Sequence, residues 1–138
     1  MNIVSETNVA YMDDQKTNDL VKIARKGLTY AEFASLYDMA PFNLNDWARI
    51  LSLSDRSLQR YQKSGAHFSM AVSEKLLLIG YLFNRGHSVF NDSDRFFSWL
   101  QKPSVPLGGQ TPLSLLDSIF GIDLILDELG RIEHGIFS

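Results

Sequence analysis

The sequence predicts an all-α protein, and three observations support that prediction. Apolar residues recur at helical spacings of three and four, whereas no stretch of useful length alternates apolar and polar residues as a strand does. Residues that favour helix starts (Ser, Thr, Asn, Asp) precede the apolar runs, and Gly or Pro follows them. Apolar residues make up 45% of the 138 residues, which is enough for a sizeable core.

The first helices are expected after a polar N-terminal segment. Residues 1–16 show no apolar period and are expected to be disordered or loosely attached. Asn18 is then placed to cap a short helix that stops at Gly27. The sequence TYAE, beginning at Thr29, is a capping-box pattern and predicts a second helix start. After the interruption at APF, Asn43 is placed to cap a third helix.

The same kinds of start and stop residues bound the remaining elements. Ser54 starts a fourth helix that ends at Gly65, and a long, densely apolar helix is expected over residues 69–90. The sequence DSDRFFSWL predicts a short helix, and KPSVPLGGQTP a loop. Thr111 followed by Pro112 is a good helix opening, because proline at the first helical position loses no hydrogen bond. One face of the last helix is expected to carry Ile122, Ile125, Leu129 and Ile132.

Charge is distributed unevenly along this chain of net charge −3. Residues 1–20 hold one Lys and four acidic residues, which gives −3. Residues 21–63 hold seven basic and four acidic residues, which gives +3, and residues 64–138 hold five and eight, which gives −3. Because phosphate contacts are short-ranged in salt, a local basic segment matters more to DNA affinity than the total charge.

The sequence LNDWARILSLSDRSLQRYQKSG, residues 44–65, predicts a helix-turn-helix. Such a unit needs a small residue where its helices meet, a turn of about three residues and a capped second helix with polar outward positions. Ala48 supplies the small contact and residues 52–54 the turn. Leu58 and Tyr61 are expected to anchor the second helix to the core. The residues expected to face DNA are Arg56, Ser57, Gln59, Arg60 and Lys63.

The side chains of this second helix suit both kinds of DNA contact. Arg and Gln make paired hydrogen bonds to guanine and adenine edges, whereas Lys63 and either arginine would equally hold phosphates. Two features depart from the pattern: Ser52 stands where glycine is common, and Asp55 places a negative charge near the groove. The alternative interpretation is a helical hairpin with a solvated basic face.

The C-terminal half resembles a known family. The sequence WLQKPSVPLGGQTPLSLL (residues 99–116), followed by LGRIEHGIFS (residues 129–138), is similar to the toxin-binding domain of Xre/MbcA/ParS-like bacterial antitoxins. Members carry a Trp-Leu pair, a Pro-containing loop ending Leu-Gly-Gly and a Thr-Pro-Leu helix start. They end in a tail of the type Arg-Ile-Glu-(Tyr or His)-Gly-Val-Phe. The resemblance is strong over about residues 69–138 and looser over residues 28–64, where members carry an Xre-like helix-turn-helix.

This resemblance implies a function, partners and a domain organisation. Residues 17–65 would be the DNA-binding module, and residues 66–138 a helical dimerisation and toxin-binding domain. The protein would be the antitoxin of a two-gene system whose toxin has a RES domain and degrades NAD⁺ or transfers ADP-ribose. It would form a homodimer through the C-terminal domain and repress its own operon by binding operator DNA. The alternative is a stand-alone dimeric helix-turn-helix transcriptional regulator without a toxin partner.

The resemblance also assigns a role to the unusual chain end, RIEHGIFS. In this family the C-terminal tail blocks the toxin's active-site cleft. Gly135 would release the chain from the last helix, and Ile136 and Phe137 would insert as apolar anchors. The carboxylate of Ser138 would meet cationic groups that otherwise hold NAD⁺. Contacts at the rim would come from Arg131, Glu133 and His134. The alternative is that Ile136 and Phe137 fold back onto the protein's own helices.

Other function classes have no support in the sequence. There is no cysteine, and His67, His87 and His134 share no metal-ligand spacing. Neither a Gly-x-Ser-x-Gly elbow nor a phosphate-binding glycine loop is present, so no enzyme activity, metal or cofactor is expected. The N-terminus lacks a signal-peptide pattern, and the apolar run over residues 76–83 is too short for a bilayer. The protein is therefore expected in the bacterial cytoplasm, without a membrane partner.

Overall fold

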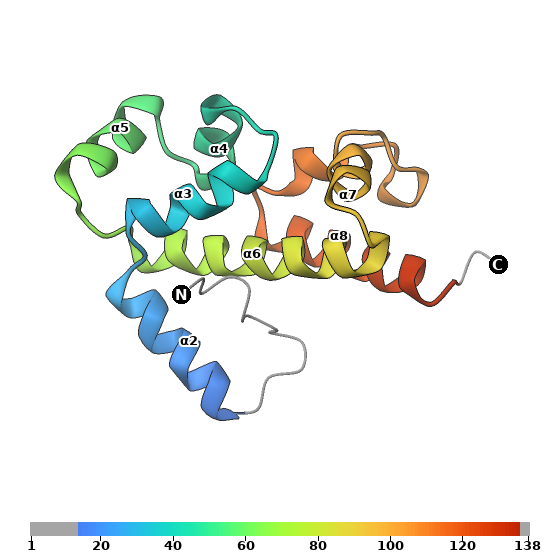
Figure 1. The fold of residues 1–138 in the computed structure, drawn as a ribbon, viewed down its shortest axis with the longest axis horizontal. Coiled ribbons are helices and arrows are strands. Elements are labelled where there is room, and N and C mark those ends of the chain that lie inside the picture. Colours follow the sequence, from blue (N-terminus) through green and yellow to red (C-terminus); the bar gives the residue numbers. More distant parts are fainter. Residues whose placement is uncertain (1–13, 136–138) are drawn as a thin grey trace. The chain divides into compact units, whose positions relative to one another are not determined.

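The computed structural model describes residues 14–135, and its regular elements are all helical there (Figure 1). The α-helices are α2 (Asp14–Lys26), α3 (Tyr30–Met39), α4 (Leu44–Leu51), α5 (Asp55–Ser64), α6 (Met70–Phe90), α7 (Ser93–Leu100) and α8 (Ile119–Glu133). Two 3₁₀ turns are η2 (Val105–Leu107) and η3 (Pro112–Leu115). The predicted all-α class is confirmed. No helix in this part of the chain is long and apolar enough to cross a membrane.

The chain forms two compact units, the first ending at Tyr81 and the second beginning at Leu82. The boundary between them lies inside α6, which continues from one unit into the other. The division between residues 65 and 66, which the family resemblance implies, separates a DNA-binding module from a toxin-binding domain and stays a prediction about function.

An aromatic cluster around Phe33 forms the core of the N-terminal unit. The Phe33 ring meets Tyr30 and Trp47 edge-on, both with ring centroids 5.3 Å away. Phe68 lies 6.0 Å from Phe33 and Tyr37 lies 6.1 Å from it, again edge-on. Edge-to-face pairs at these distances are favourable beyond the area that they bury. The cluster therefore packs α3, α4 and the segment before α6 against one another. These elements form the core on which α5 is anchored.

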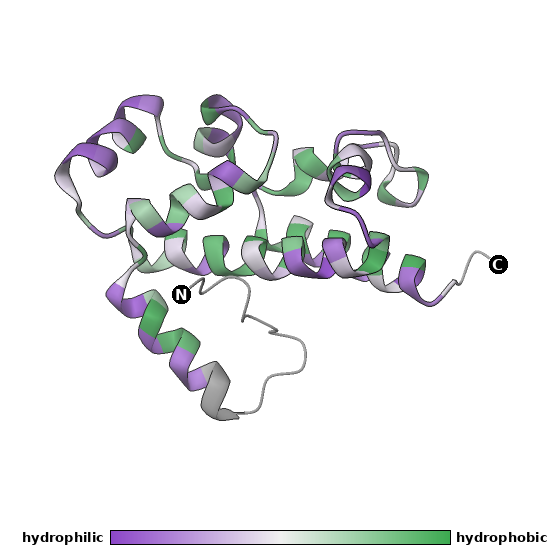
Figure 2. Cartoon of the chain, viewed as in Figure 1, coloured by the Kyte–Doolittle hydropathy of each residue, from purple (hydrophilic) through white to green (hydrophobic). Residues whose placement is uncertain are grey.

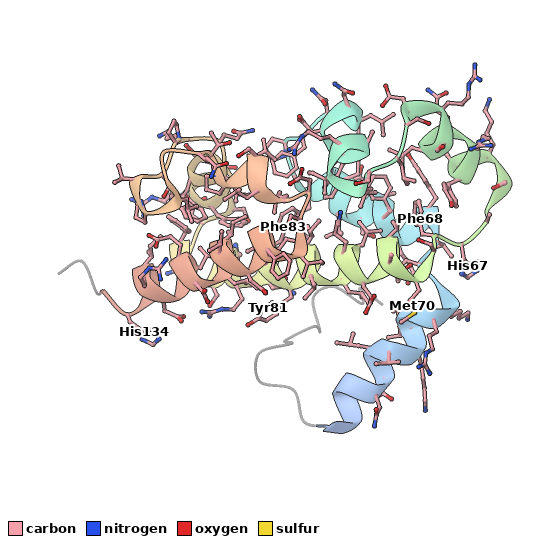
Figure 3. The ribbon with its side chains drawn as sticks, turned by 180° about the vertical axis from the view of Figure 1, so that it is seen from behind. His67, Phe68, Met70, Tyr81, Phe83 and His134 are labelled. Atoms are coloured by element: carbon pink, nitrogen blue, oxygen red, sulfur yellow. The ribbon has the colours of Figure 1, made fainter. Side chains whose placement is uncertain are left out.

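The junction between α2 and α3 is joined to the segment that leads into α6 (Figure 3). The Phe68 amide donates to the Leu28 carbonyl at 2.8 Å, and the Leu28 amide donates to the buried Ser73 hydroxyl at 2.8 Å. His67 Nδ1 donates to the Gly27 carbonyl at 2.7 Å. Gly27 has φ +89°, and a Cβ there would lie 2.2 Å from the Phe68 carbonyl oxygen. Glycine is therefore required at this predicted helix stop.

The C-terminal unit has a second aromatic core. Phe83 on α6 meets Phe97 on α7 edge-on, with centroids 5.3 Å apart. Phe96 also packs on this cluster, and a Cβ added to Gly86 would lie 2.1 Å from its ring. Trp99 is half-buried beside the Phe90 ring, at 5.6 Å. The absence of a side chain at Gly86 is what lets α7 approach α6 closely.

Most predicted helix ends are confirmed. Each is specified by residues within about one turn of the helix end, so it can be recognised from the sequence alone. Thr29 forms a complete capping box with Glu32 at the start of α3. The side chain of Asn43 caps α4 and that of Ser54 caps α5. Gly65 ends α5 with φ +70°. Figure 2 shows that most of α5 is hydrophilic between these two ends. Its predicted anchors are the buried Leu58 and the half-buried Tyr61, whose ring lies 4.5 Å from that of Phe68.

Two predicted helix starts are wrong. Asn18 lies inside α2, which begins at Asp14, because the polar residues before Asn18 include no Gly or Pro that would stop the helix. Thr111 does cap the helical turn that begins at Pro112, but that turn is a 3₁₀ helix of only four residues. The Ser118 side chain then caps the start of α8 by accepting from the Gly121 amide. Of residues 1–16, expected to be disordered or loosely attached, residues 14–16 instead belong to α2, and residues 1–13 lie outside the described part of the chain.

Candidate functional site

The first candidate site is the segment from α4 to α5 in the N-terminal unit. Helix α4 ends at Ser52, and the Leu53 amide then donates to the Ala48 carbonyl at 2.9 Å. Three residues later α5 has begun, because the Ser54 hydroxyl accepts from the Ser57 amide at 3.0 Å. Two short helices are therefore joined by the predicted turn over residues 52–54.

Ser52 adopts the left-handed conformation, with φ +56° and ψ +40°. This conformation costs a residue with a Cβ roughly 1–2 kcal/mol, whereas glycine adopts it freely. Glycine also loses more backbone entropy on folding, by about 0.5–1 kcal/mol. We therefore expect Ser52→Gly to raise the free energy of unfolding by about 0.5–1 kcal/mol in urea titrations. Ser52→Ala is the matched control, because it keeps the Cβ and should give no gain.

The structure exposes four of the five predicted DNA-facing side chains, namely Arg56, Gln59, Arg60 and Lys63. The fifth predicted residue, Ser57, is half-buried. Its hydroxyl accepts from the Ser54 hydroxyl at 3.0 Å and from Arg60 Nη2 at 3.1 Å. The third position of a helix faces back toward its cap, so Ser57 belongs to the start of α5.

A hollow of about 680 Å³ lies between the two helices. Its lining includes the predicted residue Arg56 and a second cation, Arg49, from the last turn of α4. Asp46 and Asp55 line the same hollow, so its charge is mixed. Arg49 was not among the predicted DNA-facing residues, although it lies in the basic segment over residues 21–63. Arg49 is therefore a further cation close to Arg56 on this surface.

The second candidate site is the C-terminal end of α8. Helix α8 ends at Glu133, and His134 is its exposed C-cap (Figure 3). Gly135 follows with φ +65°, and its amide donates to the Ile132 carbonyl at 3.2 Å. The expected left-handed glycine at the helix end is therefore present. The proposed anchors Ile136 and Phe137, and Ser138 after them, lie outside the described residues.

Two of the predicted rim residues form ion pairs within the C-terminal unit. Arg131 Nε donates to Glu128 at 2.7 Å, and Glu128 is largely buried. Arg85 on α6 donates to both carboxylate oxygens of Glu133, at 2.8 and 3.2 Å. This hydrogen bonding lowers the pKa of Glu133 below its ordinary value. Sequence reasoning missed Arg85, because a partner 48 positions away leaves no local pattern.

Helix α8 also carries an exposed apolar face that the sequence analysis did not single out. Phe120 is 83% exposed, and Ile119 and Leu124 beside it are 42% and 48% exposed. Phe120 and Leu124 are four positions apart and so lie on one side of the helix, away from the buried Ile122 and Ile125. This spacing was the available signal. Apolar exposure of this kind is typical of an interaction surface.

Comparison with known proteins bears on both candidate sites. Residues 85–135 match the family model of the antitoxin Xre/MbcA/ParS C-terminal toxin-binding domain. A protein of Photorhabdus laumondii named Antitoxin Xre is 29% identical over 117 residues, which is 84% of this chain and 79% of the relative. A protein of Yersinia enterocolitica with the same name is 27% identical over 120 residues, or 86% and 81% of the two chains. Both similarities extend through most of the present chain.

Proposed function

From the premise that this chain is an Xre/MbcA/ParS-like antitoxin, we propose that it neutralises a RES-domain toxin by inserting its C-terminal tail into the toxin's active-site cleft. The toxin would degrade NAD⁺ or transfer ADP-ribose in the bacterial cytoplasm. The antitoxin would act by binding, without catalysis of its own. The observation that carries this proposal is the position of the tail, which begins where the matched toxin-binding domain ends, at Gly135.

The composition of the tail fits the proposed cleft. Its two large apolar side chains, Ile136 and Phe137, are the residue types that dominate binding energy when they are buried in a pocket. His134 is exposed at the last turn of α8 and would contact the rim of the cleft. Arg131 is half-exposed and would also contact the rim of the cleft, in addition to its ion pair with Glu128.

The antitoxin is also proposed to bind operator DNA and thereby repress its own operon. The geometry that supports this is the capped α5, joined to α4 by a three-residue turn, with four exposed polar or basic side chains. Arg56 and Arg60 lie four positions apart, so they project from one side of α5. That side would enter the major groove, with Gln59 and Lys63 beside it.

The exposed apolar face of α8 is the proposed homodimer contact, because the matched domain offers three large apolar side chains there within six residues. Phe120→Asp would place a carboxylate in the centre of this contact. We expect the dimer dissociation constant to rise at least about 100-fold, as for a central interface residue. Light scattering during gel filtration measures the change. Phe120→Leu, which keeps a large apolar side chain at this position, is the control and should dimerise nearly as the parent does. An unchanged dimer in Phe120→Asp would contradict the assignment.

The test of the antitoxin function is a pull-down of the intact protein from its native cells, with co-purifying proteins identified by mass. Recovery of a RES-domain protein whose co-expression with the antitoxin restores growth supports the proposal. The second candidate, a stand-alone dimeric regulator, is favoured by the exposed basic helix α5. It would be supported by recovery of operator DNA alone, together with growth that does not depend on the antitoxin.

A further inference from the structure

A bidentate ion pair between Arg85 and Glu133 holds the last turn of α8 against α6. Arg85 Nη2 lies 2.8 Å from Glu133 Oε1, and Arg85 Nη1 lies 3.2 Å from Glu133 Oε2. The side chain of Arg85 is 18% exposed and that of Glu133 is 34% exposed. Such paired geometry fixes the orientation of both groups, which single contacts between long surface side chains do not. The pair therefore joins α6 to the final residue of α8.

The position of this pair matters more than its strength. The last turn of a helix has carbonyls without intrahelical partners and frays readily unless something holds it. A further ion pair of α8, between Glu128 and Arg131, joins residues of the same helix and does not attach that helix to a neighbour. Arg85 is also the first residue of the matched toxin-binding domain, and Glu133 lies two residues before its end. The pair therefore joins the beginning of the matched domain to its end, just before the tail begins.

We propose that Arg85 and Glu133 position the tail for entry into the toxin, an inference that rests on the tail-insertion function. With the last turn of α8 held against α6, the direction of the chain at Gly135 is set before binding. Binding then requires less ordering, and a smaller ordering cost gives a higher affinity. Glu133 is accordingly a positioning residue that acts through Arg85, and its carboxylate is not a contact for the toxin.

The first experiment measures the affinity of full-length variants for the purified RES-domain toxin recovered in the pull-down. We expect Arg85→Ala and Glu133→Gln each to raise the dissociation constant about tenfold. The exchanged pair, Arg85→Glu with Glu133→Arg, should recover most of that loss. Arg95→Ala removes the same charge from an exposed position on α7 and should change little. If Glu133 contacted the toxin directly, the exchanged pair would bind worse than either single variant, and that result would overturn the proposal.

A double-mutant cycle separates positioning from a general structural role. Phe137→Ala weakens the tail itself, so the cost of Arg85→Ala should fall below about threefold in that background. Equal costs in both backgrounds would show that the pair supports only the fold and would overturn the inference. If Phe137→Ala and deletion of residues 135–138 both leave toxin affinity unchanged, the tail-insertion function itself fails. A loss in those two variants with no loss in Arg85→Ala overturns the positioning role alone.

Discussion

Deletion of residues 135–138 is expected to abolish neutralisation while dimerisation and operator binding remain intact. Full burial of a large apolar side chain is worth about 1.5–3 kcal/mol, so the loss of Ile136 and Phe137 together should weaken toxin binding at least about 100-fold. A co-expression growth assay measures protection, and titration calorimetry measures affinity. The matched control is Phe137→Leu, which keeps an apolar anchor and should keep most of the protection.

The same deletion distinguishes insertion from the alternative in which Ile136 and Phe137 pack on the protein's own helices. In the alternative, removing them exposes apolar surface in the free antitoxin, and its free energy of unfolding should fall by a few kcal/mol. With insertion, the unfolding of the free antitoxin should hardly change. Full protection by the truncated chain, or a large loss of its stability, would contradict the proposal.

The double variant Arg56→Ala with Arg60→Ala is expected to lower operator affinity at least about 30-fold, because each lost base or phosphate contact costs about 1–3 kcal/mol. If both arginines hold phosphates, the slope of log affinity against log salt concentration should also fall by about two. Gel-shift titrations at several salt concentrations measure both quantities. Neutralisation of the toxin should not change, since these residues lie in the N-terminal unit.

A matched control for this variant removes the same charge elsewhere in the unit. Lys22→Ala with Arg25→Ala takes two exposed cations from α2 and should preserve most of the specific affinity. Because Arg60 donates to the Ser57 hydroxyl, circular dichroism should verify that α5 remains folded in the double variant. Undiminished operator binding by Arg56→Ala with Arg60→Ala would place the recognition surface elsewhere, with Arg49 on α4 the next residue to substitute.

The sequence by itself determined the helical class and most helix ends. The capping box of Thr29, the caps at Asn43 and Ser54, and the glycine stops at Gly27 and Gly65 are all present as predicted. Each depends on hydrogen bonds or backbone angles within a few residues, so the information is local. The error at Thr111 has the same origin, because a good cap specifies where a helical turn begins and not how far it continues.

Only the tertiary structure decided what depends on residues far apart in the chain. It placed Arg85 against Glu133 across 48 positions, and it brought α7 onto Gly86. It also left Ile119, Phe120 and Leu124 exposed on a helix that buries Ile122, Ile125 and Leu129. Helical periodicity shows that two apolar residues share a face, but burial depends on which neighbours fold against that face. Those contacts are made between elements, and no spacing along the chain records them.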